Sequence, residues 1–94
     1  MEPSSDSWLQ GTTVLITGGA SGIGRATALA FAAAAAAARV SRPLAVITAD
    51  IDQEHGEETC LLVRQRGADA AHFVHTDVRS EQEVAALADW VRSR

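Results

Sequence analysis

The chain has 94 residues, of which 47% are hydrophobic and 21% charged, and its net charge is −4. This length limits it to one small domain, and the balance is that of a globular protein rather than a disordered one. All eight basic residues are arginines scattered along the chain, which argues against nucleic acid or an anionic membrane as a partner.

Nothing in the sequence predicts export or membrane insertion. The first residues lack the pattern of a secretory signal, and the longest apolar stretch, 26–38, is too short to cross a bilayer. The single cysteine, Cys60, rules out an internal disulfide and fits a reducing compartment. We therefore expect a cytoplasmic protein.

The first half of the chain predicts an arm, a strand and a helix. Residues 1–10 are polar and are expected to form a flexible N-terminal arm ahead of a domain over 11–94. The run 12–17 is apolar on both faces, which is typical of a buried parallel strand. A glycine turn and a long helix to about Ala38 follow. One face of that helix, at helical spacing, carries Ile23, Ala26, Thr27, Ala30, Phe31 and Ala34.

The second half repeats the alternation. Strands are predicted over 44–49 and 70–76, and helices over about 53–66 and after Ser80. Asp52 is expected to cap the second helix and Gly67 to end it, while Ser80 and Glu83 form a capping box for the third. The order β-α-β-α-β-α predicts a three-stranded parallel sheet of strand order 3-2-1. That is one half of a doubly wound, Rossmann-like α/β fold.

The turn between the first strand and its helix has the glycine spacing of a phosphate-binding loop. Gly18 allows a tight reversal, Gly22 removes a side chain where a ligand must come close, and Gly24 allows the helix to pack closely. The helix N-terminus suits an anion such as a pyrophosphate. Because the glycines lie between a strand and a helix, they are better evidence than a lone glycine pattern.

Three motifs in order carry a family resemblance. Residues 17–24, TGGASGIG, resemble the TGxxxGxG fingerprint of the short-chain dehydrogenases/reductases, and the strand ends 49–52 and 75–78 resemble the family's acidic positions. The residues 9–11, LQG, also stand where the family has them ahead of the first strand. The resemblance covers roughly 9–93. It implies the N-terminal, cofactor-binding half of an oxidoreductase that transfers hydride between a nicotinamide cofactor and an alcohol or carbonyl substrate.

The resemblance also implies roles for single residues. Asp50, followed by Ile51, would accept hydrogen bonds from the adenosine ribose, and Asp77 with the Val78 backbone would contact adenine. The pyrophosphate and its ribose would lie against the turn residues Gly18, Ser21, Gly22, Ile23 and Gly24.

The cofactor preference follows from charge. A carboxylate at Asp50 suits two ribose hydroxyls but repels a 2′-phosphate. Family members that prefer NADP often carry Arg or Lys where this chain has Ser21, so both positions favour NAD. Arg25 lies near the helix start, but a basic residue there is common in the family and does not indicate NADP.

Two features depart from the family pattern. Asp50 lies 50 − 18 = 32 residues after Gly18, several more than the family usually has. Either a longer helix and a longer loop absorb the excess, or the alanine run is a sequence error. The chain also has no Asn, Tyr or Lys, whereas the resemblance implies an Asn, Ser, Tyr and Lys set from beyond the third strand. We expect the chain to be inactive alone.

The first functional interpretation is the cofactor half of an oxidoreductase. The alternatives are a non-catalytic module that binds NAD or a partner, and a truncated inactive product. The first strand has an open edge, which predicts aggregation, an oligomer or a partner there.

Other side chains have simpler interpretations. His55, His72 and His75 match no common zinc spacing, and the last two point to opposite faces of one strand. Cys60, Trp8 and Trp90 are expected to pack rather than react.

Overall fold

The computed structural model describes residues 9, 11–38, 44–68 and 70–93, so the expected arm and Trp8 lie outside the described residues. The predicted β-α-β-α-β-α order is confirmed, and each predicted strand end is within one residue of its place in the structure. The elements are β1 (Thr13–Thr17), α1 (Gly22–Ala38), β2 (Ala45–Asp50), α2 (Gln53–Arg66), β3 (Ala70–His75) and α3 (Glu81–Arg92).

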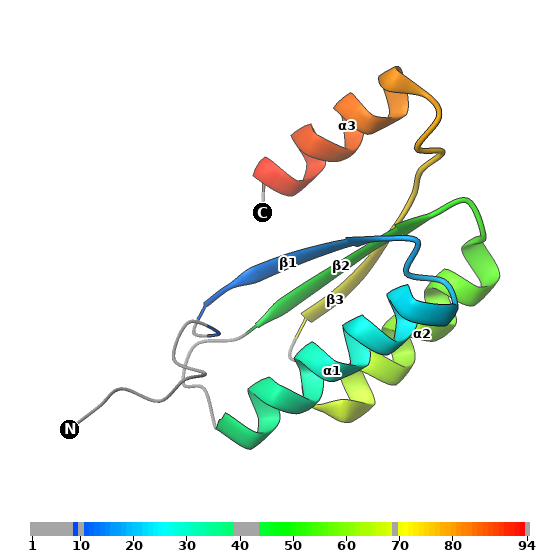
Figure 1. The fold of residues 1–94 in the computed structure, drawn as a ribbon. Helices are drawn as coiled ribbons and strands as arrows, with labels where there is room; N and C mark the ends of the chain where they lie inside the picture. Colours follow the sequence, from blue (N-terminus) through cyan, green and yellow to red (C-terminus); the bar gives the residue numbers. More distant parts are fainter. Residues whose placement is uncertain (1–8, 10, 39–43, 69, 94) are drawn as a thin grey trace.

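The three strands form one parallel sheet in the order β1-β2-β3, which is the predicted order read from the other edge. Ala45 of β2 is level with Thr13 on one side and with Ala70 on the other. α1 and α2 cover one face of the sheet, and α3 lies on the opposite face (Figure 1). This is the arrangement that right-handed crossovers produce when the first two run in the same direction across a sheet.

β1 is a parallel strand, as predicted, but it is buried on one face only. Val14 and Ile16 pack toward the core under α1, whereas Leu15 on the other face is 42% exposed. That second face belongs to α3, which approaches the sheet through a T-shaped contact between the rings of Trp90 and His72, 5.5 Å apart. Trp90 is therefore a packing residue, as expected, and its ring contacts β3.

The predicted apolar face of α1 is largely wrong. The buried residues of α1 are Ala28, Ala32 and Ala35, none of which belongs to the predicted face, whereas Ile23 from that face is 86% exposed. Past the end of α2, a Cβ placed on Gly67 would lie 2.7 Å from the Cβ of Ala36, so only glycine fits at that contact. At the other end of α1, Arg25 donates to Thr59 on α2, and this contact helps to set which face of α1 turns inward. From the predicted face, Phe31 and Ala34 pack at the border of the core.

The predicted helix ends are mostly confirmed. Asp52 caps α2 by accepting a hydrogen bond from His55 N, and Gly67 ends it at φ +124°. At α3, Ser80 Oγ accepts from Glu83 N at 3.2 Å, but the Glu83 carboxylate accepts from Asp77 N instead of completing the capping box. Ser80 N already donates to Asp77 O at 2.9 Å, so it needs no second partner.

The alanine run is helical to Ala38, in keeping with a longer helix as the source of the extra residues before β2. Residues 39–43, at the end of that excess, lie outside the described residues. Among the described residues, every helix falls short of the length and apolarity that a bilayer crossing requires.

Candidate functional site

The carboxyl ends of the three strands meet around one hollow of about 180 Å³. Backbone hydrogen bonds hold this edge together, from Gly18 N to Ala49 O at 2.8 Å and from Thr76 N to Asp50 O at 2.9 Å. Among the predicted site residues, those that line the hollow are Gly18, Asp50, Ile51, Asp77 and Val78. Sequence reasoning missed Ala49, Thr76 and Arg79, which complete the lining.

The turn after β1 needs its glycines for different reasons. Gly18 has φ +71° and Gly22 has φ +58°, a region that favours glycine. A Cβ on Gly24 would lie 2.0 Å from Gly18 O, so α1 rests directly on the turn, whereas a Cβ on Gly22 would meet nothing within 4 Å. Ser21 precedes α1 and Gly22 to Gly24 begin it, and none of these residues lines the hollow.

Gly19 is not among the predicted site residues, although the sequence signals it through the pair Gly18-Gly19. A Cβ on Gly19 would lie 2.7 Å from the Cβ of Thr48. The turn therefore crosses the sheet close to β2, and the next residue, Ala20, is 1% exposed. This close crossing brings the backbone of the turn to the end of β2.

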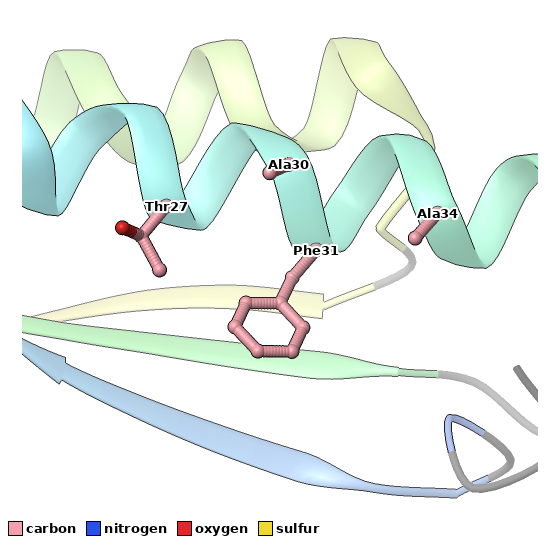
Figure 2. Close-up of a pocket in the computed structure, with 4 residues that line it drawn as sticks. All are labelled: Thr27, Ala30, Phe31 and Ala34. Atoms are coloured by element: carbon pink, nitrogen blue, oxygen red, sulfur yellow. The ribbon is translucent and has the colours of Figure 1, made fainter.

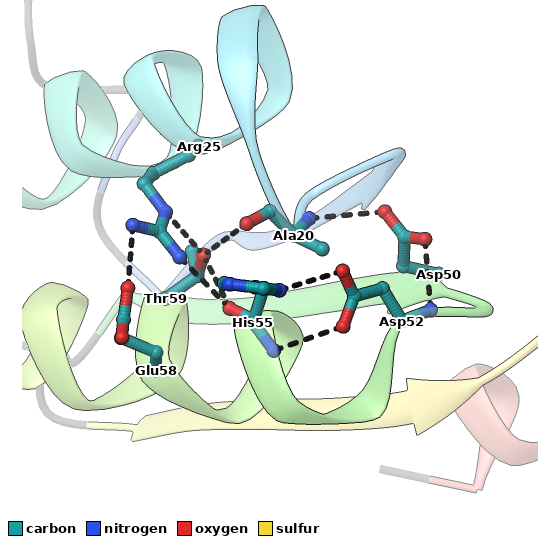
Figure 3. Close-up of polar contacts among 7 residues, drawn as sticks. All are labelled: Ala20, Arg25, Asp50, Asp52, His55, Glu58 and Thr59. Carbon is teal, nitrogen blue, oxygen red and sulfur yellow. Dashed lines mark hydrogen bonds and ion pairs between the residues drawn. The ribbon is translucent and has the colours of Figure 1, made fainter.

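Asp50 stands where that crossing ends (Figure 3). Its Oδ2 accepts from Ala20 N at 3.1 Å, and its Oδ1 accepts from Asp52 N at 3.1 Å. A carboxylate has about four acceptor sites. Asp50 thus fixes the turn to β2 and still has acceptor capacity for hydroxyl groups in the hollow.

Asp77 has a different partner. The Arg79 side chain donates from Nε to Oδ1 at 3.1 Å and from a terminal nitrogen to Oδ2 at 3.0 Å, and Arg79 N donates to Oδ1 at 2.9 Å. These bonds, of which the side-chain ones have the largest effect, hold the pKa of Asp77 below its ordinary value. Because the Arg79 side chain is 83% exposed, the pair is weak and open to exchange.

A second cluster lies beside the turn, between the first turn of α1 and α2 (Figure 3). Arg25, whose side chain is 24% exposed, forms an ion pair with Glu58 at 2.7 Å. It also donates from Nε to Thr59 Oγ1 at 2.9 Å and from a terminal nitrogen to His55 O at 3.0 Å. From the sequence, Arg25 is considered only for its charge. The signal for this network is the i, i+3, i+4 spacing of its three partners on α2.

At the start of α2, His55 and Asp52 form a second pair. His55 Nδ1 lies 2.7 Å from Asp52 Oδ2, and His55 N donates to Asp52 Oδ1. The side-chain hydrogen bond raises the pKa of His55 above its ordinary value. In return, the backbone and side-chain bonds from His55 lower the pKa of Asp52. Asp52 is thus engaged as a helix cap, as predicted.

The remaining candidates do not form a site. Within the described part of the chain, no three His, Cys, Asp or Glu side chains are placed to hold a metal ion. Cys60 is buried, with its sulfur 3.5 Å from Thr48 Oγ1, which confirms a packing role. A second hollow, of about 260 Å³, lies along α1 beside Phe31 (Figure 2). The hydroxyl that lines it, on Thr27, already donates to Ile23 O at 2.7 Å.

Several known proteins are similar to this chain in sequence and in fold. Momilactone A synthase of Oryza sativa subsp. japonica is 42% identical over 86 residues, which are 92% of this chain and 27% of that protein. A hydroxysteroid dehydrogenase from Escherichia coli superposes with a TM-score of 0.78 at 33% identity, over 96% of this chain and 34% of its own. An NAD⁺-bound xylitol dehydrogenase superposes with a TM-score of 0.74 at 31% identity, over 88% and 28%.

The chain therefore spans about a quarter of the length of the curated relatives it matches. The match is nevertheless complete along the fold described above, because the family model for short chain dehydrogenases covers residues 12–94. The matched residues include the glycine turn after β1 and the acidic ends of β2 and β3 in this chain. This chain belongs to the short chain dehydrogenase family.

Proposed function

We propose that this chain binds the adenosine end of a nicotinamide dinucleotide, with NAD preferred over NADP, as the cofactor-binding half of a short chain oxidoreductase. The observation that carries the proposal is the hollow at the strand ends, where Gly18, Asp50 and Asp77 lie together. The NAD⁺-bound state of the similar xylitol dehydrogenase supports a dinucleotide as the ligand.

The residues present fit the phosphate part of such a ligand. A Cβ on Gly22 would meet open space at the start of α1, where an anion can approach the backbone. α1 has no acidic side chain in its first turn, so no acidic group there offsets the positive end of the helix dipole. In our proposal, the backbone of Ser21, Gly22, Ile23 and Gly24 holds the pyrophosphate and its ribose.

The size of the hollow supports the adenosine end alone. Its volume of about 180 Å³ is below the roughly 300–1,000 Å³ of pockets that enclose a whole ligand. In our proposal Asp50, next to Ile51, accepts from the ribose hydroxyls. Asp77 accepts from the adenine amino group beside the Val78 backbone. Because Arg79 already occupies Asp77, binding exchanges part of that ion pair for the ligand.

The preference for NAD rests on the charge around the ribose. A 2′-phosphate would meet the carboxylate of Asp50 at close range, which is unfavourable by Coulomb's law. Two cations lie near the hollow, Arg25 engaged by Glu58 and Thr59 and Arg79 engaged by Asp77, and either would have to leave these partners to pair with the phosphate. Both effects favour a ribose with free hydroxyls.

In a complete family member, the bound nicotinamide would accept a hydride from an alcohol substrate or donate one to a carbonyl substrate. The residues of this chain would hold the far end of that cofactor. The second candidate function is a non-catalytic module that binds NAD or a partner. It ranks second because β1, which among the described residues pairs with β2 on one side only, argues against a module that is stable without a partner on that edge.

Calorimetric titration of the purified chain with NAD and NADP tests the proposal. We expect NAD to bind more tightly than NADP. Asp50→Ala should weaken NAD binding and reduce the ratio of the NAD affinity to the NADP affinity. One lost charged hydrogen-bond acceptor corresponds to roughly a tenfold weaker affinity for NAD.

Asp89→Ala is the matched control, because Asp89 is an exposed carboxylate paired with Arg92 on α3. It should leave both affinities unchanged. An unchanged NAD-to-NADP ratio in Asp50→Ala would remove Asp50 from the site. A well-folded chain that shows no heat with millimolar NAD would rule out cofactor binding by this chain.

A further inference from the structure

We infer that Arg25 and Thr59 act as positioning residues that hold the glycine turn against Asp50, and thereby set the affinity for the adenosine ribose. The ribose part of this inference rests on the function proposed above. Neither side chain lines the hollow at the strand ends. Their effect would pass through the backbone of one residue, Ala20.

Ala20 is the point at which three elements meet (Figure 3). It is 1% exposed, its N–H donates to Asp50 Oδ2 at 3.1 Å, and its carbonyl oxygen lies 3.4 Å from Thr59 Oγ1. The turn is therefore attached to the end of β2 through one backbone group and to α2 through the other. Releasing the α2 attachment would leave Ala20 held by its hydrogen bond to Asp50, while Gly18 N stays bonded to Ala49 O.

The direction of the Thr59 hydroxyl proton decides whether that attachment forms. The hydroxyl has one proton and two acceptors in range, His55 O at 3.1 Å and Ala20 O at 3.4 Å. On an isolated helix, threonine bonds the carbonyl four residues back, which is His55 O. In that case Ala20 O would lose its partner.

Arg25 shifts this balance toward Ala20. Its terminal nitrogen donates to His55 O at 3.0 Å, and that oxygen also accepts the regular helix bond of α2, so both of its lone pairs are occupied. Arg25 Nε donates to Thr59 Oγ1 at 2.9 Å and fills a lone pair on the hydroxyl. The hydroxyl proton is then directed to Ala20 O.

The position of Arg25 in the fold restricts the movement of its guanidinium group. It follows Gly24, whose lack of a side chain seats the first turn of α1 on Gly18 O. Its third donor group forms the ion pair with Glu58 at 2.7 Å, and its side chain is only 24% exposed. Hydrogen bonds in such a partly buried network are stronger than they are in water. The network therefore fixes the distance between the turn and α2.

Thr59→Val and Thr59→Ser form the test, because valine keeps the shape and serine keeps the hydroxyl. Two quantities are measured on the full 94-residue chain: the hydrogen exchange rate of the Ala20 amide by NMR, and the affinity for NAD by calorimetry. We expect Thr59→Val to raise the exchange rate and weaken NAD binding, each by about tenfold, while Thr59→Ser stays within about twofold. A role in general stability would instead raise exchange throughout β2.

Arg25→Lys provides an independent arm if Thr59→Val does not fold. Lysine keeps the charge for Glu58 but loses the planar fork, so it should reproduce the faster Ala20 exchange and the weaker NAD binding. Arg92→Lys, at an exposed ion pair on α3, is the control.

Equal Ala20 exchange in the valine and serine variants, or in Arg25→Lys and the parent chain, would overturn the inference. If the parent chain binds no NAD, the proposed function fails, and the exchange rates still decide whether Arg25 and Thr59 hold the turn.

Discussion

The three carboxylates at the strand ends are distinguished by their partners. Asp50 accepts from two backbone amides, Asp52 from the backbone and ring of His55, and Asp77 from the Arg79 guanidinium. Backbone amides do not titrate, whereas an imidazole does near neutral pH. The same residue type is therefore a fixed acceptor in one place and part of a pH-dependent pair in another.

The His55–Asp52 pair predicts a pH effect on stability. Folding raises the pKa of His55 above 6.5, so the folded state favours the protonated imidazole. The stabilisation is complete below pH 6.5 and is lost as the pH rises through the folded pKa. Thermal melts should show a lower midpoint on the alkaline side of this window. NMR titration of the ring should give a pKa above 6.5.

Asp52→Asn tests the cause, because asparagine keeps the helix cap and removes the charge. It should return the pKa of His55 toward 6.5 and flatten the melting profile over that window. Glu57→Gln removes a charge from the same helix without touching His55 and should change neither. A His55 pKa that stays raised in Asp52→Asn would show that another group is responsible.

At the scale of elements, the glycine turn and α1 form one unit. The first turn of the helix lies on Gly18 O, and Gly24 is the residue that permits this contact. Gly22 differs, because its φ of +58° is the constraint and the space around it is open. The two glycines therefore predict different costs for the same substitution.

Gly24→Ala should destabilise the chain by at least about 3 kcal/mol, because the added methyl meets a backbone oxygen that cannot rotate away. Gly22→Ala should cost about 1–2 kcal/mol, the penalty of a left-handed conformation for a residue with a Cβ. Urea unfolding followed by circular dichroism, without ligand, measures both. Equal costs would mean that α1 shifts away from the turn.

Much of the fold could be predicted because its signals are local. Strand and helix periods, Asp52 as a cap and Gly67 as a helix end depend on a few neighbouring residues. The inward face of α1 could not be predicted, because an almost uniform run of alanines has no period to read. Its orientation depends on the start of the helix, where Gly24 packs on Gly18 O and Arg25 contacts α2.

The site divides in the same way. Gly18, Asp50 and Asp77 could be placed together because the carboxyl ends of parallel strands share one edge of a sheet. The Arg25 network could not, since it depends on the rotation of α2 relative to α1. Nor could the incomplete capping box, where Glu83 turns to Asp77 N because Ser80 N is already bonded.

At the scale of the whole molecule, the sheet is asymmetric. Among the described residues, β1 is an edge strand that pairs with β2 on one side. Gly18 N and Thr12 O bond to β2, so by alternation the backbone groups of Thr13, Leu15 and Thr17 point to the open edge. Such an edge is a template for another strand, in line with the oligomer or partner expected from the sequence.

We therefore expect the chain to self-associate with increasing concentration, and Leu15→Lys to suppress this, because charged side chains on edge strands oppose pairing. Leu15 is 42% exposed, so lysine can be accommodated. Leu61→Lys is the control, on α2 at 53% exposure. Sedimentation velocity measures the association. Equal behaviour of the two variants would exclude the β1 edge as the contact.

The alanine run leaves α1 without any large side chain from residue 32 to 38. A helix whose surface is uniform methyl groups is almost smooth, and it can turn about its own axis with little change in packing. Its angular setting must then come from the other end, where Gly24 seats the helix and Arg25 reaches across to α2. Arg25 thus prevents a helix of 17 residues from rotating about its own axis.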